Sequence, residues 1–284
     1  MGAGLAEVCA RAGLDVLVAV SRPSRVAAGR ARLVKSLDNA ARKGKLSEAD
    51  RAGALSRVSF TADLTDFADR QFVIEAGPEQ ESVKQEVFST LDKVVESEDA
   101  ILGSNTSSFP IIQLGRVTDR PGKVIGTHFF NPVTVLPLVE LVGSVLTEES
   151  TVTAAEEFVT VVLGKQVVRT KDRSGFVVNA LLIPYLLSAI RMYESGMASM
   201  SDIDAAMKLG CAHPMGPFAL IDLIGLDIVE AISESLYSEY REPHYSPPPL
   251  LARMVSAGLL GKKSGRGFHD YTPVVQAVTE RAAA

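Results

Sequence analysis

The residues best suited to move a proton in this sequence are His128 and Glu140, which lie twelve positions apart. A histidine can accept a proton near neutral pH because its ordinary pKa is about 6.5. A carboxylate bound to its second ring nitrogen fixes the tautomer and stabilises the imidazolium. The hydroxyl of Ser107, in the segment SNTSS, can hydrogen-bond a reacting oxygen. These residue types suit the oxidation of an alcohol, although a lone histidine flanked by phenylalanines is also common as a structural residue.

Glycines near the start of the sequence indicate a second chemical feature, a dinucleotide site. The run Met1-Gly2-Ala3-Gly4 has the pattern that ends a GxGxxG turn, in which a helix N-terminus binds pyrophosphate. The first strand and the first two glycines of that pattern are not in the sequence. An acidic residue usually ends the second strand and binds the adenosine ribose, but here that position is Val20. Ser21 and Arg22 favour a 2′-phosphate and hence NADP, unless Arg22 is only a solvated loop residue.

Composition places the chain among ordinary globular proteins. It has 284 residues, of which 46% are hydrophobic and 22% charged, enough for a substantial core. The net charge of −5, without a basic stripe, argues against a nucleic-acid partner. The most apolar run, 176–190, is too short to span a bilayer, and no signal peptide opens the sequence, so we expect a cytoplasmic protein without a membrane segment. Cys9 and Cys211 are expected to be buried free thiols, with no metal site.

The first half of the chain alternates between short β-branched runs and helical stretches. Such alternation is typical of βαβ crossovers and of a mainly parallel sheet with helices on both faces. A first helix is expected to run to about Gly13. The sequence further predicts strands at 15–20, 71–76, 100–103, 124–129, 136–141 and 166–169, and helices at 27–42 and 79–95.

From Ser174 onward the periodicity becomes helical throughout. Helices are predicted at 174–194, 201–209, 224–240 and 249–257. We therefore expect a Rossmann-like, dinucleotide-binding α/β domain at 1–171 and an all-helical domain at 172–284. The apolar helix 174–194 is long enough to form a subunit interface. Ligands of such α/β folds bind beyond the carboxyl ends of the strands.

Five motifs relate the whole chain to a known family. SNTSS, HFFNPV, SGFVVNALL, HPMGPFAL and GKKSGRGF occur in the order and approximate spacing of the L-3-hydroxyacyl-CoA dehydrogenases. The sequence most resembles bacterial members that act on 3-hydroxybutyryl-CoA, including its segments DRSGFVVNALL and EPHYSPPPLL. The resemblance implies a homodimeric enzyme of fatty acid metabolism (β-oxidation). Such an enzyme interconverts (S)-3-hydroxybutyryl-CoA and acetoacetyl-CoA with NAD or NADP.

The resemblance also implies roles for individual residues. His128 would be the general base and Glu140 its orienting partner. Ser107 and Asn179 would contact the substrate near its reacting oxygen, and Ser107 would also contact the nicotinamide side of the cofactor. Besides Gly2, Ser21 and Arg22, the cofactor-binding candidates are Glu79, Lys84, Asn105 and Lys263. Ser36 and Lys43 match CoA-binding positions, and Lys43 would supply a local cation for the CoA phosphates.

Departures from the family pattern cluster at the cofactor. They are the absent first strand and glycines, Val20, and Gly77-Pro78 after Glu75, where the family usually has apolar residues. Two alternatives to the dehydrogenase therefore stay open. One is a related enzyme that oxidises a hydroxy acid without CoA, and the other is a cofactor-deficient acyl-CoA-binding or structural homologue.

Three further histidines are less informative. His213 lies in the turn Ala212–Pro217, which is either a structural turn or a lid over the acyl chain. His244 and His269 lie in polar, loop-like segments, where we expect exposed side chains.

Overall fold

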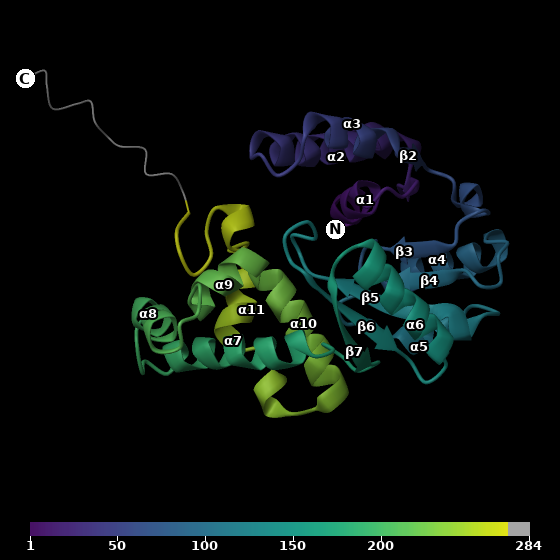
Figure 1. The fold of residues 1–284 in the computed structure, drawn as a ribbon. Helices are drawn as coiled ribbons and strands as arrows, with labels where there is room; N and C mark the ends of the chain where they lie inside the picture. Colours follow the sequence, from purple (N-terminus) through teal and green to yellow (C-terminus); the bar gives the residue numbers. More distant parts are fainter. Residues whose placement is uncertain (272–284) are drawn as a thin grey trace, which may run out of the picture. The chain divides into compact units, whose positions relative to one another are not determined.

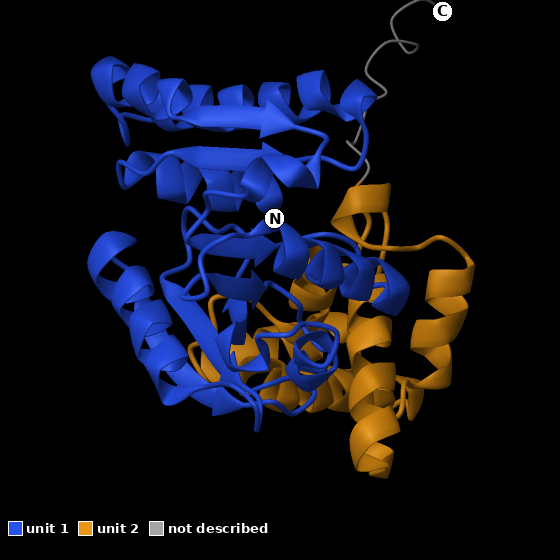
Figure 2. Cartoon of the chain, turned by 90° about the vertical axis from the view of Figure 1, so that its right-hand side faces the viewer, with its two compact units in different colours: residues 1–176 blue, residues 177–284 orange. Residues whose placement is uncertain are grey.

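The computed structural model describes residues 1–271, and its internal contacts divide the chain into two compact units (Figure 2). Unit 1, Met1–Phe176, combines strands and helices, whereas unit 2, Val177–Ala284, is helical in its described part (Figure 1). The predicted fold class, a Rossmann-like α/β domain followed by a helical domain, is confirmed. None of the described helices is long and apolar enough to cross a membrane.

The larger sheet of unit 1 has five strands in the order β3-β4-β5-β6-β7. All neighbours are parallel except β5 and β6, which are antiparallel. The strands are β3 (Phe72–Glu75), β4 (Ile101–Ser104), β5 (Val124–Phe129), β6 (Leu138–Gly143) and β7 (Gln166–Lys171). Every residue of β4 and β5 is buried, which places these two strands in the centre of the core.

A separate two-stranded sheet precedes the larger one in the chain. It pairs β1 (Val16–Ala19) with β2 (Val58–Thr61) in parallel. Helix α1 (Gly2–Arg11) connects the two sheets, because Leu5 packs in the core of β5 and β6 while Ala10 packs in the core of β1 and β2. In a dinucleotide-binding fold a further strand lies between β1 and β3. The sheet of this chain is divided at that position.

Helices cover both sheets of unit 1. They are α2 (Val26–Arg42), α3 (Glu48–Ser56), α4 (Glu81–Val94), α5 (Ile111–Gly115) and α6 (Glu149–Glu157), the last followed by a π-helical turn at Phe158–Val162. The sequence did not predict β2, α3, α5 or α6. The start of α3 nevertheless carries a recognisable signal, because the side chain of Ser47 caps it by accepting a hydrogen bond from the Asp50 main chain.

Unit 2 packs its helices around one apolar core. They are α7 (Val178–Glu194), α8 (Met200–Gly210), α9 (Pro217–Ile224), α10 (Leu226–Tyr240) and α11 (Pro249–Ser256). Helix α7 begins later than predicted because Gly175 and Phe176 both have positive φ angles, 75° and 49°, which interrupt a right-handed helix. Helix α9 was not predicted. In the first turn of α9, the main chain of Phe218 and Ala219 donates hydrogen bonds to the carboxylate of Asp204.

The two cysteines are free and differ in their surroundings. Cys9 in α1 is largely buried, and this burial raises the pKa of its thiol to about 11. Cys211 is exposed, so the prediction of two buried thiols is wrong for this residue. It follows α8 directly and precedes the turn before α9, where the chain lies on the surface.

Candidate active site

Polar residues gather along the carboxyl edge of β3, β4 and β5. Glu75 pairs with Ser104, and Ser104 pairs in turn with Gly126, so β3 and β4 end level with each other, beside the middle of β5. His128 follows Gly126 by two residues, and the segment Asn105–Ser107 follows Ser104. This is the edge at which ligands of parallel α/β sheets bind.

His128 and Glu140 form a buried pair on adjacent antiparallel strands. They are direct partners in the register of β5 and β6, which brings their side chains together on one face. His128 Nδ1 lies 2.7 Å from Glu140 Oε2, and the two side chains are 7% and 0% exposed. A buried ionised carboxylate accepts hydrogen bonds only, so Nδ1 carries the proton in this pair. The lone pair of a neutral imidazole is then on Nε2, which can accept a proton.

Aromatic side chains pack beside the imidazole, and an amide side chain binds the main chain next to it. The ring centroids of Phe130 and Phe176 lie 4.5 and 5.5 Å from that of His128. The side-chain oxygen of Asn105 accepts a 2.9 Å hydrogen bond from the main chain of Phe129, next to the histidine. Asn105, predicted to bind cofactor, therefore also ties the loop after β4 to the end of β5.

The loop after β4 is bound by the carboxylate of Glu79. Its two oxygens accept hydrogen bonds from the main chain of Ser107 at 2.8 Å and from the hydroxyl of Thr106 at 3.1 Å. Glu79 is half exposed, whereas Lys84, the second residue predicted near the nicotinamide ribose, is buried and forms ion pairs with Glu75 and Glu79. The cofactor roles of Glu79 and Lys84 stay predictions, and the geometry brings both close to Ser107.

The other residues predicted to bind the dinucleotide lie at the start of α1 and just after β1, and their roles stay predictions. Around Gly2, at the start of α1, no atom other than those of its chain neighbours and its own helix backbone lies within 4 Å of the position that a Cβ would occupy. The first turn of α1 has neither a side-chain cap nor an acidic residue, so its main-chain amides and dipole favour an anion. Ser21 and Arg22 are exposed just after β1, whereas the side chain of Val20 packs toward α2, 3.5 Å from a Cβ placed on Gly29.

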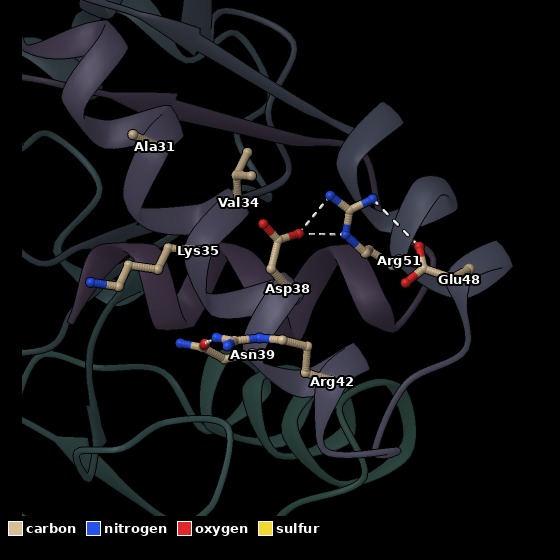
Figure 3. Close-up of a pocket in the computed structure, with 8 residues that line it drawn as sticks. All are labelled: Ala31, Val34, Lys35, Asp38, Asn39, Arg42, Glu48 and Arg51. Atoms are coloured by element: carbon tan, nitrogen blue, oxygen red, sulfur yellow. Dashed lines mark hydrogen bonds and ion pairs between the residues drawn. The ribbon is translucent and has the colours of Figure 1, made fainter.

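The predicted CoA-binding residues lie on α2. Ser36 is half-buried on this helix, and Lys43 is exposed at its C-terminal end. A pocket of about 610 Å³ lies between α2 and α3, and Figure 3 shows Asp38 holding Arg51 on its wall. Neither Ser36 nor Lys43 lines it. The lining is Ala31, Val34, Lys35, Asp38, Asn39, Arg42, Glu48 and Arg51, with one more basic than acidic residue.

Two of the predicted residues belong to unit 2. Asn179 is buried in the first turn of α7. The ammonium of Lys263 contacts both carboxylate oxygens of Asp227, at 2.5 and 2.6 Å. Their predicted contacts with substrate and cofactor stay predictions. Within residues 1–271, no cluster of His, Cys, Asp or Glu side chains is arranged to hold a metal ion.

The remaining histidines also lie in unit 2, and two of them contact side chains from distant segments of the chain. The Nδ1 atom of His213 lies 3.3 Å from the hydroxyl of Tyr185. The Nε2 atom of His269 lies 3.1 Å from Asp204, and the His269 side chain is 35% exposed, so it is only partly exposed where full exposure was expected. The main chain of His269 also donates a hydrogen bond to Asp222, and neither carboxylate was predicted from the sequence to have a role.

Comparison with known proteins gives the family. Residues 1–173 match the family described as 3-hydroxyacyl-CoA dehydrogenase, NAD binding domain, and residues 175–271 match its C-terminal domain. The chain belongs to the 3-hydroxyacyl-CoA dehydrogenase family. Unit 1 thus contains the NAD-binding domain of the family, and the prediction of an enzyme is confirmed.

Relatives of this dehydrogenase resemble it along nearly their whole length. A 3-hydroxybutyryl-CoA dehydrogenase of Mycobacterium tuberculosis is 57% identical over 95% of both chains. The crystal structure of M. tuberculosis FadB2 has a TM-score of 0.94 at 57% identity, covering 95% of each chain. That of the (S)-3-hydroxybutyryl-CoA dehydrogenase PaaH1 of Ralstonia eutropha has a TM-score of 0.91 at 43% identity, covering 96% of this chain and 95% of the other. These findings support the dehydrogenase over an inactive homologue.

Proposed function

We propose that this dehydrogenase interconverts (S)-3-hydroxybutyryl-CoA and acetoacetyl-CoA with NAD. The observation that carries the proposal is the buried pair of His128 and Glu140 at the carboxyl edge of the NAD-binding domain. Its relatives named 3-hydroxybutyryl-CoA dehydrogenase, at 43 to 57% identity, support the choice of the short acyl chain.

The chemistry assigned to the protein is proton transfer and positioning. His128 Nε2 removes the proton of the 3-hydroxyl group, and Glu140 stabilises the imidazolium that forms. NAD, when bound, supplies the acceptor for the hydride that leaves C3. Ser107 donates a hydrogen bond to the reacting oxygen, and Glu79 holds the main chain of Ser107 in place. In the reducing direction the imidazolium returns its proton to the oxygen of acetoacetyl-CoA.

Basic residues along α2 are assigned to the CoA portion. Lys43 is exposed at the end of this helix, and Lys35 and Arg42 line the adjacent pocket. In a chain of net charge −5, such a local group of cations is needed to attract the phosphates of CoA.

The test of this function is the loss of NADH absorbance at 340 nm when acetoacetyl-CoA is added to the protein. Turnover with acetoacetyl-CoA and none with free acetoacetate is the expected result. Turnover of free acetoacetate at a similar rate, without inhibition by added CoA, would instead favour an enzyme of hydroxy acids. Binding of acetoacetyl-CoA without binding of NADH would favour the cofactor-deficient alternative.

We further propose that the enzyme is a cytoplasmic homodimer that pairs through unit 2. Large apolar side chains on this unit are exposed, among them Leu181 on α7, Leu223 on α9 and Ile228 on α10. Exposed apolar side chains on neighbouring helices favour an interface. Light scattering coupled to gel filtration tests this, and Leu181→Glu should shift the measured mass from dimer to monomer.

A further inference from the structure

Glu75 forms the centre of a buried polar network under the candidate site. It ends β3, and its side chain is only 5% exposed. Its Oε2 atom lies 2.8 Å from both Lys84 Nζ and Ser104 Oγ. Its other oxygen, Oε1, accepts a hydrogen bond from the main chain of Gly77. Every contact of this carboxylate is therefore with a hydrogen-bond donor, which suits its ionised form.

Lys84 carries the network from Glu75 to the site. The lysine side chain is 1% exposed, and its ammonium lies 2.8 Å from Glu75 and 3.1 Å from Glu79. Glu79 is 44% exposed and accepts hydrogen bonds from Ser107 and Thr106. Two ion pairs and a hydrogen bond thus connect Glu75, through Lys84 and Glu79, to the main chain of Ser107.

The difference in burial between Glu75 and Glu79 shows which carboxylate matters more for the charge of Lys84. A buried ammonium is costly unless carboxylates compensate its charge, and Glu75 is the buried one of its two partners. Without the charge of Glu75, Lys84 would depend on Glu79 alone. Either Lys84 would then lose its proton, or the Glu79 carboxylate would move toward the Lys84 ammonium. In both cases the hydrogen bond from the main chain of Ser107 to Glu79 would change, and with it the position of Ser107.

Gly77 fits the same arrangement. A Cβ at this position would lie 2.9 Å from Glu75 Oε1, closer than real Cβ contacts allow. Glycine therefore permits the main chain to approach the Glu75 carboxylate. This gives a physical reason for one of the departures from the family pattern, the Gly77-Pro78 step.

We propose that Glu75 is a positioning residue of the dehydrogenase, acting through Lys84 and Glu79 on the place of Ser107. In this role Glu75 acts only through its neighbours and does not itself touch substrate or cofactor. The proposal rests on the proposed function, because it assumes that Glu79 and Ser107 face the nicotinamide end of NADH.

The experiment compares Glu75→Gln with the wild-type chain and a matched control. Glutamine keeps the shape of the side chain and removes its charge. The control is Asp92→Asn, because Asp92 in α4 is also a buried carboxylate, and its contacts are with Arg120, at 3.0 Å, and with the main chain of Asp119. The measurements are kcat and KM for NADH with acetoacetyl-CoA, the calorimetric affinities for NADH and AMP, and the melting temperature.

Glu75→Gln should lower kcat/KM for NADH by about 10- to 100-fold, the effect of losing one charged hydrogen bond. Its affinity for NADH should fall, while that for AMP, which lacks the nicotinamide ribose, should stay unchanged. Asp92→Asn should lower the melting temperature and leave both affinities at their wild-type values. Equal effects of the two substitutions on the NADH constants would overturn the proposal, since the role of Glu75 would then be structural only.

A second variant keeps the test decisive if Glu75→Gln does not fold. Gly77→Ala displaces the Glu75 carboxylate without removing a charge, and should shift the NADH constants in the same direction by a smaller factor. Unchanged NADH constants in a folded Gly77→Ala protein would then contradict the proposal. A wild-type chain that binds NADH but does not turn over acetoacetyl-CoA would overturn the proposed function alone, and NADH and AMP binding would still decide the role of Glu75.

Discussion

His128 and Glu140 face each other across the antiparallel pair β5 and β6, with Nδ1 and Oε2 2.7 Å apart. Because the residues are register partners, the backbone of the sheet itself sets their separation. Glu140 has no exposed surface, so water does not compete for its carboxylate. The pair therefore keeps its geometry without substrate, which is what a general base needs to act without rearrangement.

Loss of the base gives the first prediction. His128→Ala should lower kcat for acetoacetyl-CoA reduction by about 10²- to 10⁴-fold, the usual contribution of general acid–base catalysis. The exposed His244 provides the control, and His244→Ala should retain the wild-type rate. Near-normal turnover of a folded His128→Ala protein, measured at 340 nm, would show that another group transfers the proton.

The second prediction concerns the orienting carboxylate. Glu140→Gln should lower kcat by about 10²- to 10⁴-fold with little change in KM, because an amide cannot stabilise the imidazolium charge. Since the two residues act as one unit, the double variant His128→Ala/Glu140→Gln should be no slower than His128→Ala. Steady-state rates of the four proteins measure this, and additive losses would indicate independent roles.

A third prediction addresses the cofactor. Arg22 is exposed beside Ser21 at the end of β1, where the acid typical of NAD enzymes is replaced by Val20. We expect measurable turnover with NADPH, and Arg22→Ala should lower kcat/KM for NADPH about 10-fold while leaving that for NADH unchanged. Arg32→Ala, on the exposed face of α2, is the control. An equal loss with both cofactors would exclude a specific contact with the 2′-phosphate.

The fourth prediction concerns the stability of unit 2. The buried carboxylate of Asp222 accepts hydrogen bonds from the main chain of Phe268 and His269, both at 2.8 Å, and from the hydroxyl of Tyr271. Asp222→Asn places an amide donor against these donors and should reduce the free energy of unfolding by about 2 to 3 kcal/mol. Urea denaturation measures it. Asp202→Asn, exposed on α8, should cost much less.

Local patterns predicted the elements of the central sheet but not the contacts between distant segments. Strand β5 was predicted with its observed bounds, because its β-branched and aromatic residues lie between the turn residues Gly122-Lys123 and Asn131-Pro132. Helix α3 and strand β2 were missed, since both are short and their core is supplied largely by α2. The resemblance to a family named Glu79 and Lys84. It did not reveal Glu75, whose partners Lys84 and Ser104 follow it by nine and 29 positions.

The fifth prediction concerns pH and the buried thiol of Cys9. Burial raises its pKa from 9.0 to about 11, so the folded protein keeps the thiol proton over a range in which the unfolded chain releases it. The stability from the neutral thiol is therefore complete below pH 9 and declines as the pH rises toward 11, by about 1.4 kcal/mol for each unit. Cys9→Ala removes this titration. Its destabilisation, measured by urea denaturation, should be largest below pH 9 and shrink toward pH 11. A penalty that is constant with pH would show that the Cys9 thiol has the same pKa in the folded and unfolded chain.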